Sequence, residues 1–177
     1  MIDAREYARA LFLLCEEDGI TDKILDELGV VNEALRQNPA YARLLDTPAL
    51  TKAEKLGLID EAFRSLDLNL VNFIKILCEK HSVFTLKRVE SELSALVDEA
   101  RGIERATAIS AVAMTTEQID RLRERLEAMI GKTVVLSNKI DPSVLGGIKL
   151  RYSGAQLDGT VKGRLDGFAA RLSEIVV

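Results

Sequence analysis

Residues with reactive or metal-binding side chains are scarce in this chain. Among 177 residues there are one histidine and two cysteines, and tryptophan is absent. Cys15 and Cys78 stand far apart and form no Cys-x-x-Cys or Cys-x-x-His pair, so we expect two reduced, buried thiols rather than a disulfide framework or a zinc site. His81 precedes Ser82, but no local motif supplies the orienting carboxylate and oxyanion hole that a catalytic Ser–His pair needs. The sequence therefore predicts no catalytic residue, no cofactor and no metal site, and we expect a protein that is not an enzyme.

The chain also lacks a long apolar run and a recognisable signal peptide. Its most apolar stretch, residues 68–78, is interrupted by polar side chains and falls well short of the roughly 20 residues that a membrane-spanning helix needs. Asp3, Arg5 and Glu6 interrupt the N-terminus, which is unlike a signal peptide. If the protein works at a membrane, another component is expected to hold it there.

No strong excess of basic charge is present. The net charge is −4 and the pI is about 5.2, with the acidic excess in residues 1–105, so a general nucleic-acid binder is not expected. An acidic N-terminal part suits a basic or amphipathic partner. The stretch that begins at Gly146 and Gly147 lacks the spacing of a phosphate-binding loop. We interpret these glycines as permitting a bulge or a close backbone approach where a strand begins.

Helical periodicity dominates residues 1–104. Helices are predicted over 3–17, 21–37 and 40–45, from a capping box formed by Thr51 and Glu54, over 68–80, and over 83–104. The fourth of these carries Leu56, Ile59 and Phe63, which are expected to face inward. Six helices with short connections predict a compact bundle.

The pattern changes near Gly102. Strands are predicted over 106–113, 133–140 and 148–152, with a short returning strand that reaches Leu157. Thr115 and Gln118 form a second capping box before a helix, and Thr160 is expected to cap a final helix. The fold class is therefore mainly α: an N-terminal six-helix bundle (1–104) followed by a small α+β domain (105–177).

Two helices of the predicted bundle are more apolar than one buried face requires. In the first helix, one stripe through Leu11 serves the core, while a second stripe contains Tyr7, Ala10 and Leu14. The helix over 68–80 is similarly broad, with Phe73 and Ile76 beyond a single stripe. Either the two helices form a groove for an amphipathic helix of another protein, or both are central helices that their own bundle covers on two sides.

Motifs at both ends of the chain bear on this choice. Residues 5–12 read Arg-Glu-Tyr-Ala-Arg-Ala-Leu-Phe. The C-terminal motif comprises Asp141, Gly146, Gly147, Asp158, Gly159, Arg164 and Leu165. Together the two motifs resemble the delta-subunit family of F-type ATP synthases, which includes the oligomycin-sensitivity-conferring protein. Thr160 stands where serine is usual in that family, and Leu145 where isoleucine or another apolar residue is common.

The resemblance implies a non-catalytic stator subunit at the cytoplasmic face of a bacterial membrane. It implies that the bundle binds the N-terminal helix of an alpha subunit between its first and fifth helices, and that the C-terminal domain binds the ends of the b subunits. The implied alpha-subunit site is Tyr7, Ala10, Leu14, Phe73 and Ile76. The implied b-subunit residues are Arg164, which alternatively braces the hairpin, and Phe168, which alternatively packs in the core. The rival hypothesis is a cytosolic helical adaptor that binds an amphipathic peptide and has no role in the synthase.

Overall fold

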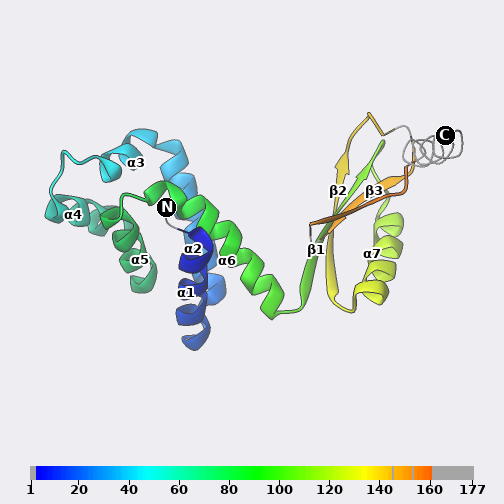
Figure 1. The fold of residues 1–177 in the computed structure, drawn as a ribbon, viewed down its shortest axis with the longest axis horizontal. Coiled ribbons are helices and arrows are strands. Elements are labelled where there is room, and N and C mark those ends of the chain that lie inside the picture. The colour runs from blue at the N-terminus through cyan, green and yellow to red at the C-terminus, as the bar shows by residue number, and fades with distance from the viewer. Residues whose placement is uncertain (1–2, 145, 153, 161–177) are drawn as a thin grey trace, which may run out of the picture. The chain divides into compact units, whose positions relative to one another are not determined.

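The chain is mainly helical and carries one small sheet. The computed structural model describes residues 3–144, 146–152 and 154–160 (Figure 1). The chain divides into two compact units, Met1–Val97 and Asp98–Val177. The predicted fold class is confirmed at this level, as a helical chain with a small four-stranded sheet.

Helices build the first unit around one hydrophobic core. Its helical elements are α1 (Ala4–Glu17), α2 (Thr21–Gln37), α3 (Pro39–Asp46), α4 (Lys52–Phe63), α5 (Leu68–Glu79), the 3-10 turn η1 (Val83–Thr85) and α6 (Leu86–Ala100). The core includes one or more fully buried side chains from each α-helix, among them Leu11, Leu28, Leu45, Ile59, Ile74 and Leu93. The apolar stripes read from the sequence therefore converge on a single interior.

Local capping sets where these helices begin. The Asp3 carboxylate accepts a hydrogen bond from the amide of Arg5 at 3.0 Å and so caps α1. The predicted capping box before α4 is present, because the Glu54 carboxylate accepts from the Thr51 amide at 2.8 Å while Thr51 Oγ1 accepts from the Glu54 amide. α3 starts at Pro39, one residue earlier than predicted, since proline suits the first position of a helix.

The inward face of α4 differs from the prediction at one position. Ile59 and Phe63 are buried as expected, whereas Leu56 is only half-buried. The preceding residue, Lys55, is buried in its place, with 6% of its surface exposed. Burial of a lysine is unusual unless its charge has a partner.

The predicted helix over 83–104 is wrong at both ends. η1 replaces its first turn, and α6 ends at Ala100. Gly102, in the left-handed region at φ +63°, turns the chain, and its carbonyl accepts the amide of Thr133 at 3.1 Å. β1 (Ile103–Ser110) therefore starts earlier than the predicted 106 and ends before Val112, which is 73% exposed.

As far as residue 160, the second unit is an α+β arrangement in which α7 (Thr116–Ile130) lies along the sheet (Figure 1). It contains β1, α7, β2 (Thr133–Ile140), β3 (Ile148–Tyr152) and β4 (Ala155–Asp158), with the strands in the order β2-β1-β3-β4. β1 and β2 are parallel, and the other two pairs are antiparallel. Leu126 of α7 packs in a core with the strand residues Ala106, Ala108, Val134 and Leu150. The predicted Thr115–Gln118 capping box opens α7.

The glycines of the C-terminal motif permit a close backbone approach, as predicted. Gly147 has φ +84°, and a Cβ at this position would lie 2.5 Å from the carbonyl oxygen of Gly159. One Asp158 carboxylate oxygen accepts from the amide of Thr160 at 3.0 Å and from its hydroxyl at 2.6 Å. These hydrogen bonds hold the pKa of Asp158 below its usual value. Gly147, Asp158 and Gly159 thus fix the two ends of the β3–β4 hairpin.

Candidate functional site

The face that α1 turns away from the core keeps a surplus of apolar side chains. α1 buries Ala8, Leu11 and Cys15 completely, which is sufficient to attach it to the interior. Leu14, of the predicted second stripe, remains 55% exposed, and Ala10 is exposed as well. Large apolar side chains with this exposure on one helix are typical of a surface that another molecule covers.

α5 is buried over most of its circumference but not all of it. Its fully buried residues include Leu70, Ile74 and Leu77. Phe73 is 8% exposed, whereas Ile76 is 48% exposed. Of the two interpretations of this helix, burial on two sides accounts for Phe73, and an open apolar face accounts for Ile76.

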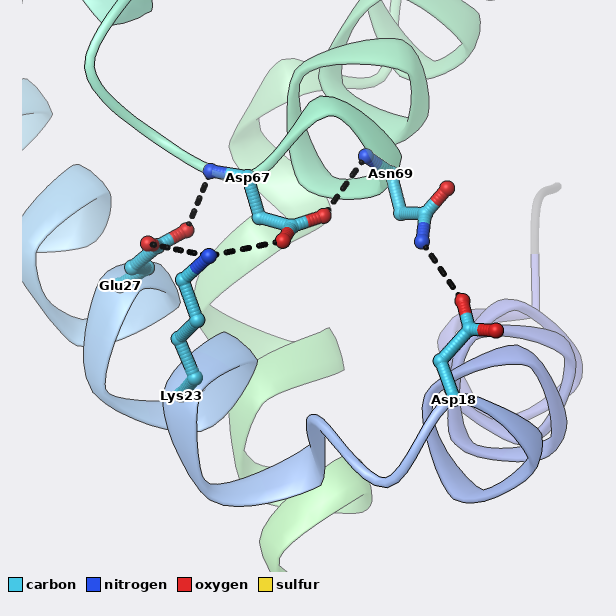
Figure 2. Close-up of polar contacts among 5 residues, drawn as sticks. All are labelled: Asp18, Lys23, Glu27, Asp67 and Asn69. Atoms are coloured by element: carbon cyan, nitrogen blue, oxygen red, sulfur yellow. Dashed lines mark hydrogen bonds and ion pairs between the residues drawn. The ribbon is translucent and has the colours of Figure 1, made fainter.

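Two contacts link α1 to α5. The rings of Tyr7 and Phe73 meet edge to face, with centroids 6.1 Å apart and an interplanar angle of 66°. At the other end of α1, the side-chain amide of Asn69 donates to the carboxylate of Asp18 at 3.1 Å (Figure 2). The two contacts lie near the two ends of α1 and in the first half of α5, and they join the helices there. We refer to the predicted residues Tyr7, Ala10, Leu14, Phe73 and Ile76 as the α1–α5 surface.

A polar cluster holds the start of α5 in position. Asp67 caps α5 by accepting the Asn69 amide at 3.0 Å, and its second oxygen accepts from the Lys23 ammonium at 2.8 Å (Figure 2). The Asp67 amide donates to the Glu27 carboxylate at 2.7 Å. The Lys23 hydrogen bond, followed by the Asn69 amide, lowers the pKa of the Asp67 carboxyl. Through this cluster α2 orients the helix that carries Phe73 and Ile76.

Sequence reasoning missed some of the residues that shape this surface. Leu13 is 57% exposed beside the predicted stripe, but nothing in a helical pattern separates it from a core residue. Asp67 directly precedes the predicted helix over 68–80, and its type at that position is the local signal of a cap. The links from Asp67 to Lys23 and from Asn69 to Asp18 join residues more than 40 positions apart, and no sequence pattern reports such pairs.

The site offers contacts rather than chemistry. Among the described residues, no three histidine, cysteine or carboxylate side chains are grouped so as to hold a metal ion. His81 Nδ1 lies 3.2 Å from the carbonyl oxygen of Asp46. Within the described ranges, no helix is both long enough and apolar enough to cross a membrane. Arg164 and Phe168, the predicted b-subunit residues, lie outside the described residues, so their roles stay predictions.

Comparisons with known proteins agree with the motifs at the two ends of the chain. A family model described as ATP synthase delta (OSCP) subunit matches residues 4–172. The chain is 34% identical over 175 residues to the ATP synthase subunit delta of Clostridioides difficile (strain 630), covering 98% of this chain and 97% of that protein. It is 33% identical over 172 residues to the protein of the same name from Geobacillus sp. (strain WCH70), with 97% of each covered.

The fold also has a counterpart among solved structures. A chain in the cryo-EM structure of the Toxoplasma gondii mitochondrial ATP synthase hexamer matches with a TM-score of 0.68, covering 97% of this chain and 98% of that one. The two sequences are 20% identical, so this likeness shows the fold alone. None of these matches supports an adaptor unrelated to the synthase. The chain therefore belongs to the ATP synthase delta (OSCP) subunit family, and it is a structural, non-catalytic subunit in the peripheral stalk of that membrane-associated complex.

Proposed function

We propose that this chain holds the catalytic head of the synthase still by joining an alpha subunit to the b subunits. The first unit binds the amphipathic N-terminal helix of an alpha subunit in a groove along α1 and α5. The second unit binds the ends of the b subunits, which are anchored in the membrane, so the chain sits peripherally at the cytoplasmic face. Because the head cannot turn with the rotor, proton-driven rotation does work on nucleotide exchange.

The exposure of Leu14 and Ile76 carries the proposal. Both side chains are about half exposed, and they lie on the two helices that the Tyr7–Phe73 contact joins. Covering the remaining surface of each such side chain would contribute up to about 1.5 kcal/mol. A few anchors of this kind at the centre of an interface are sufficient for specific association.

The shared core of the first unit would hold the α1–α5 surface rigid. We infer that α1–α6 act together as one six-helix bundle, since all six contribute side chains to the same core. The α1–α5 surface would then keep its shape under load, because well-packed interiors do not deform continuously. In this proposal, residues 1–104 bind the alpha subunit and residues 105–177 bind the b subunits.

Charge near the surface favours an amphipathic helix with basic residues. Glu6, Glu16 and Glu17 of α1 are exposed beside its apolar face. A partner helix with an apolar stripe would bury the apolar face of α1, and lysine or arginine beside that stripe would pair with these glutamates. On the b-subunit side we keep Arg164 and Phe168 as the proposed contacts.

Substitution of Ala10 tests the proposal. Ala10→Asp introduces a charge where the partner helix would lie, and an unpaired charge in an interface is costly. Titration calorimetry with a synthetic peptide of the cognate alpha-subunit N-terminus is expected to show at least about tenfold weaker binding, which corresponds to about 1.4 kcal/mol.

The matched control is Ala95→Asp, an exposed alanine within α6. This variant is expected to bind the peptide as the unaltered chain does. Circular dichroism establishes that both variants are folded. Equal peptide affinity of folded Ala10→Asp and the unaltered chain would show that α1 does not contribute to the groove.

A further inference from the structure

A second feature of the first unit lies away from the α1–α5 surface. A cavity of about 310 Å³ opens between the α3–α4 connection, α4 and the end of α5. Pro48, Leu50 and Leu56 line it with apolar groups, and Lys52, Lys55 and Glu79 line it with charged ones. None of its lining residues belongs to the α1–α5 surface.

Lys55 is the unusual member of this set. It is 6% exposed, yet its ammonium forms no hydrogen bond or ion pair with any residue that the structure describes. Every fully enclosed side-chain nitrogen or oxygen in the described ranges has a hydrogen-bond partner. The Lys55 ammonium is therefore not fully enclosed, and the space that it lines is the cavity. An ammonium that has no carboxylate partner and faces a cavity is available to pair with an anion that enters it.

The carboxylate among the residues that line the cavity is already paired. Glu79 pairs with Lys52 at 2.9 Å. Asp46 does not line the cavity; its carboxylate accepts the amide of Val83 at 3.4 Å and keeps its negative charge. The cavity therefore presents one cation more than its own carboxylates match.

The thiol of Cys78 also lies on the cavity wall, close to the charge of Lys55. Burial raises the pKa of the Cys78 thiol, the positive charge of Lys55 opposes this rise, and the negative charges of Asp46 and Glu79 add to it. The thiol lies 3.3 Å from the carbonyl oxygen of Leu45 and is therefore already hydrogen-bonded. A ligand in the cavity would therefore pair with the Lys55 ammonium rather than with the Cys78 thiol.

We propose that this cavity binds a small organic anion, whose carboxylate pairs with the Lys55 ammonium while its apolar body packs against Pro48, Leu50 and Leu56. The volume is at the lower end of small-molecule sites, so the ligand has a short apolar body. The apolar lining disfavours inorganic phosphate, which has no apolar part to cover it. Its lining residues are separate from the α1–α5 surface.

Hexanoate and 1-hexanol are matched probes, because they share a six-carbon chain and differ in charge. In the full-length ¹⁵N-labelled protein, hexanoate is expected to shift the amide signals of Leu50, Lys55 and His81 saturably. Hexanol is expected to bind at least about tenfold more weakly, and only hexanoate is expected to raise the thermal midpoint. Equal affinity for the two probes, or no saturable shift with hexanoate at millimolar concentration, would overturn the proposal.

Two variants locate the charge that binds the probe. Lys55→Met keeps the length of the side chain and removes the ammonium, so hexanoate affinity is expected to fall at least about tenfold, while Lys87→Met on the exposed face of α6 leaves it unchanged. Glu79→Gln releases Lys52 and is expected to tighten hexanoate binding. Unchanged affinity in Lys55→Met or in Glu79→Gln would contradict the assignment, and the second variant serves even if the first does not fold.

Discussion

The carboxylate of Asp67 makes two interactions that stabilise the first unit. Asp67 caps α5 through one oxygen and pairs with Lys23 of α2 through the other. Its side chain is 17% exposed, so water screens this pair less than it screens a fully exposed one. The residue type was visible in the sequence, but its partner on another helix was not, because local patterns carry no information on pairs so far apart.

Substitution of Asp67 separates its two tasks. Asp67→Ala is expected to lower the free energy of unfolding by about 1 kcal/mol or more through loss of the cap. Asp67→Asn keeps a good cap and loses the charge, so its effect is expected to be smaller. Urea unfolding of both variants at pH 7 and pH 3 measures these differences.

The pH dependence follows from the lowered pKa of Asp67. Its folded-state pKa is below the unfolded value of about 4, so the stabilisation is present above that value and is lost as the pH falls through the folded pKa. The difference between the unaltered chain and Asp67→Asn is therefore expected to shrink at pH 3. An undiminished difference at pH 3 would show that charge pairing is not its source.

At the scale of elements, strong local signals gave correct predictions. β2 occupies the predicted 133–140, where β-branched residues cluster, and α7 begins after its predicted capping box. The boundary between α6 and β1 was wrong because helical spacing continues past Ala100, whereas the parallel pairing of Ile103 with Thr133 decides where the strand begins. Pairing between distant segments overrides local pattern at such boundaries.

In the candidate site, too, features set by local pattern were predictable, and features set by contacts between distant residues were not. The apolar surplus of α1 and α5 was readable from residue spacing, and the exposure of Leu14 and Ile76 agrees with it. The burial of Phe73 was not readable, because it depends on the Tyr7 ring that packs against it from another helix. The sequence also did not indicate that Lys55 would be buried, since lysines on helices are normally solvated.

The β3–β4 hairpin offers a test of close backbone approach. Gly147→Ala is expected to lower the free energy of unfolding by about 2 kcal/mol or more, because it adds a contact 2.5 Å from the Gly159 carbonyl oxygen to the cost of a left-handed backbone. Gly154→Ala is the control, because Gly154 has φ +73° with no atom within 4 Å of the added Cβ. Thermal or urea unfolding compares the two, and equal losses would show that the close approach is not costly.

At the scale of the whole molecule, the chain consists of two units with separate cores. A connector with one partner for each unit needs only that each core be stable in itself. Changes in one unit should then leave the other unit's association intact.

A pull-down of the full chain coexpressed with its alpha and b subunits tests this division. Ala10→Asp is expected to reduce recovery of the alpha subunit and to leave recovery of the b subunits unchanged. Gly147→Ala is expected to show the opposite pattern. A variant that loses both subunits while circular dichroism shows it folded would mean that the two associations are not separately assigned to the two units.

The two contacts between α1 and α5 bear on how quickly a complex assembles. The contacts of Tyr7 with Phe73 and of Asn69 with Asp18 hold α1 and α5 together in the chain without a partner. The entropic penalty of ordering then falls on the incoming segment alone. In the proposed complex, a helix that binds the α1–α5 surface would therefore meet a site that is already ordered.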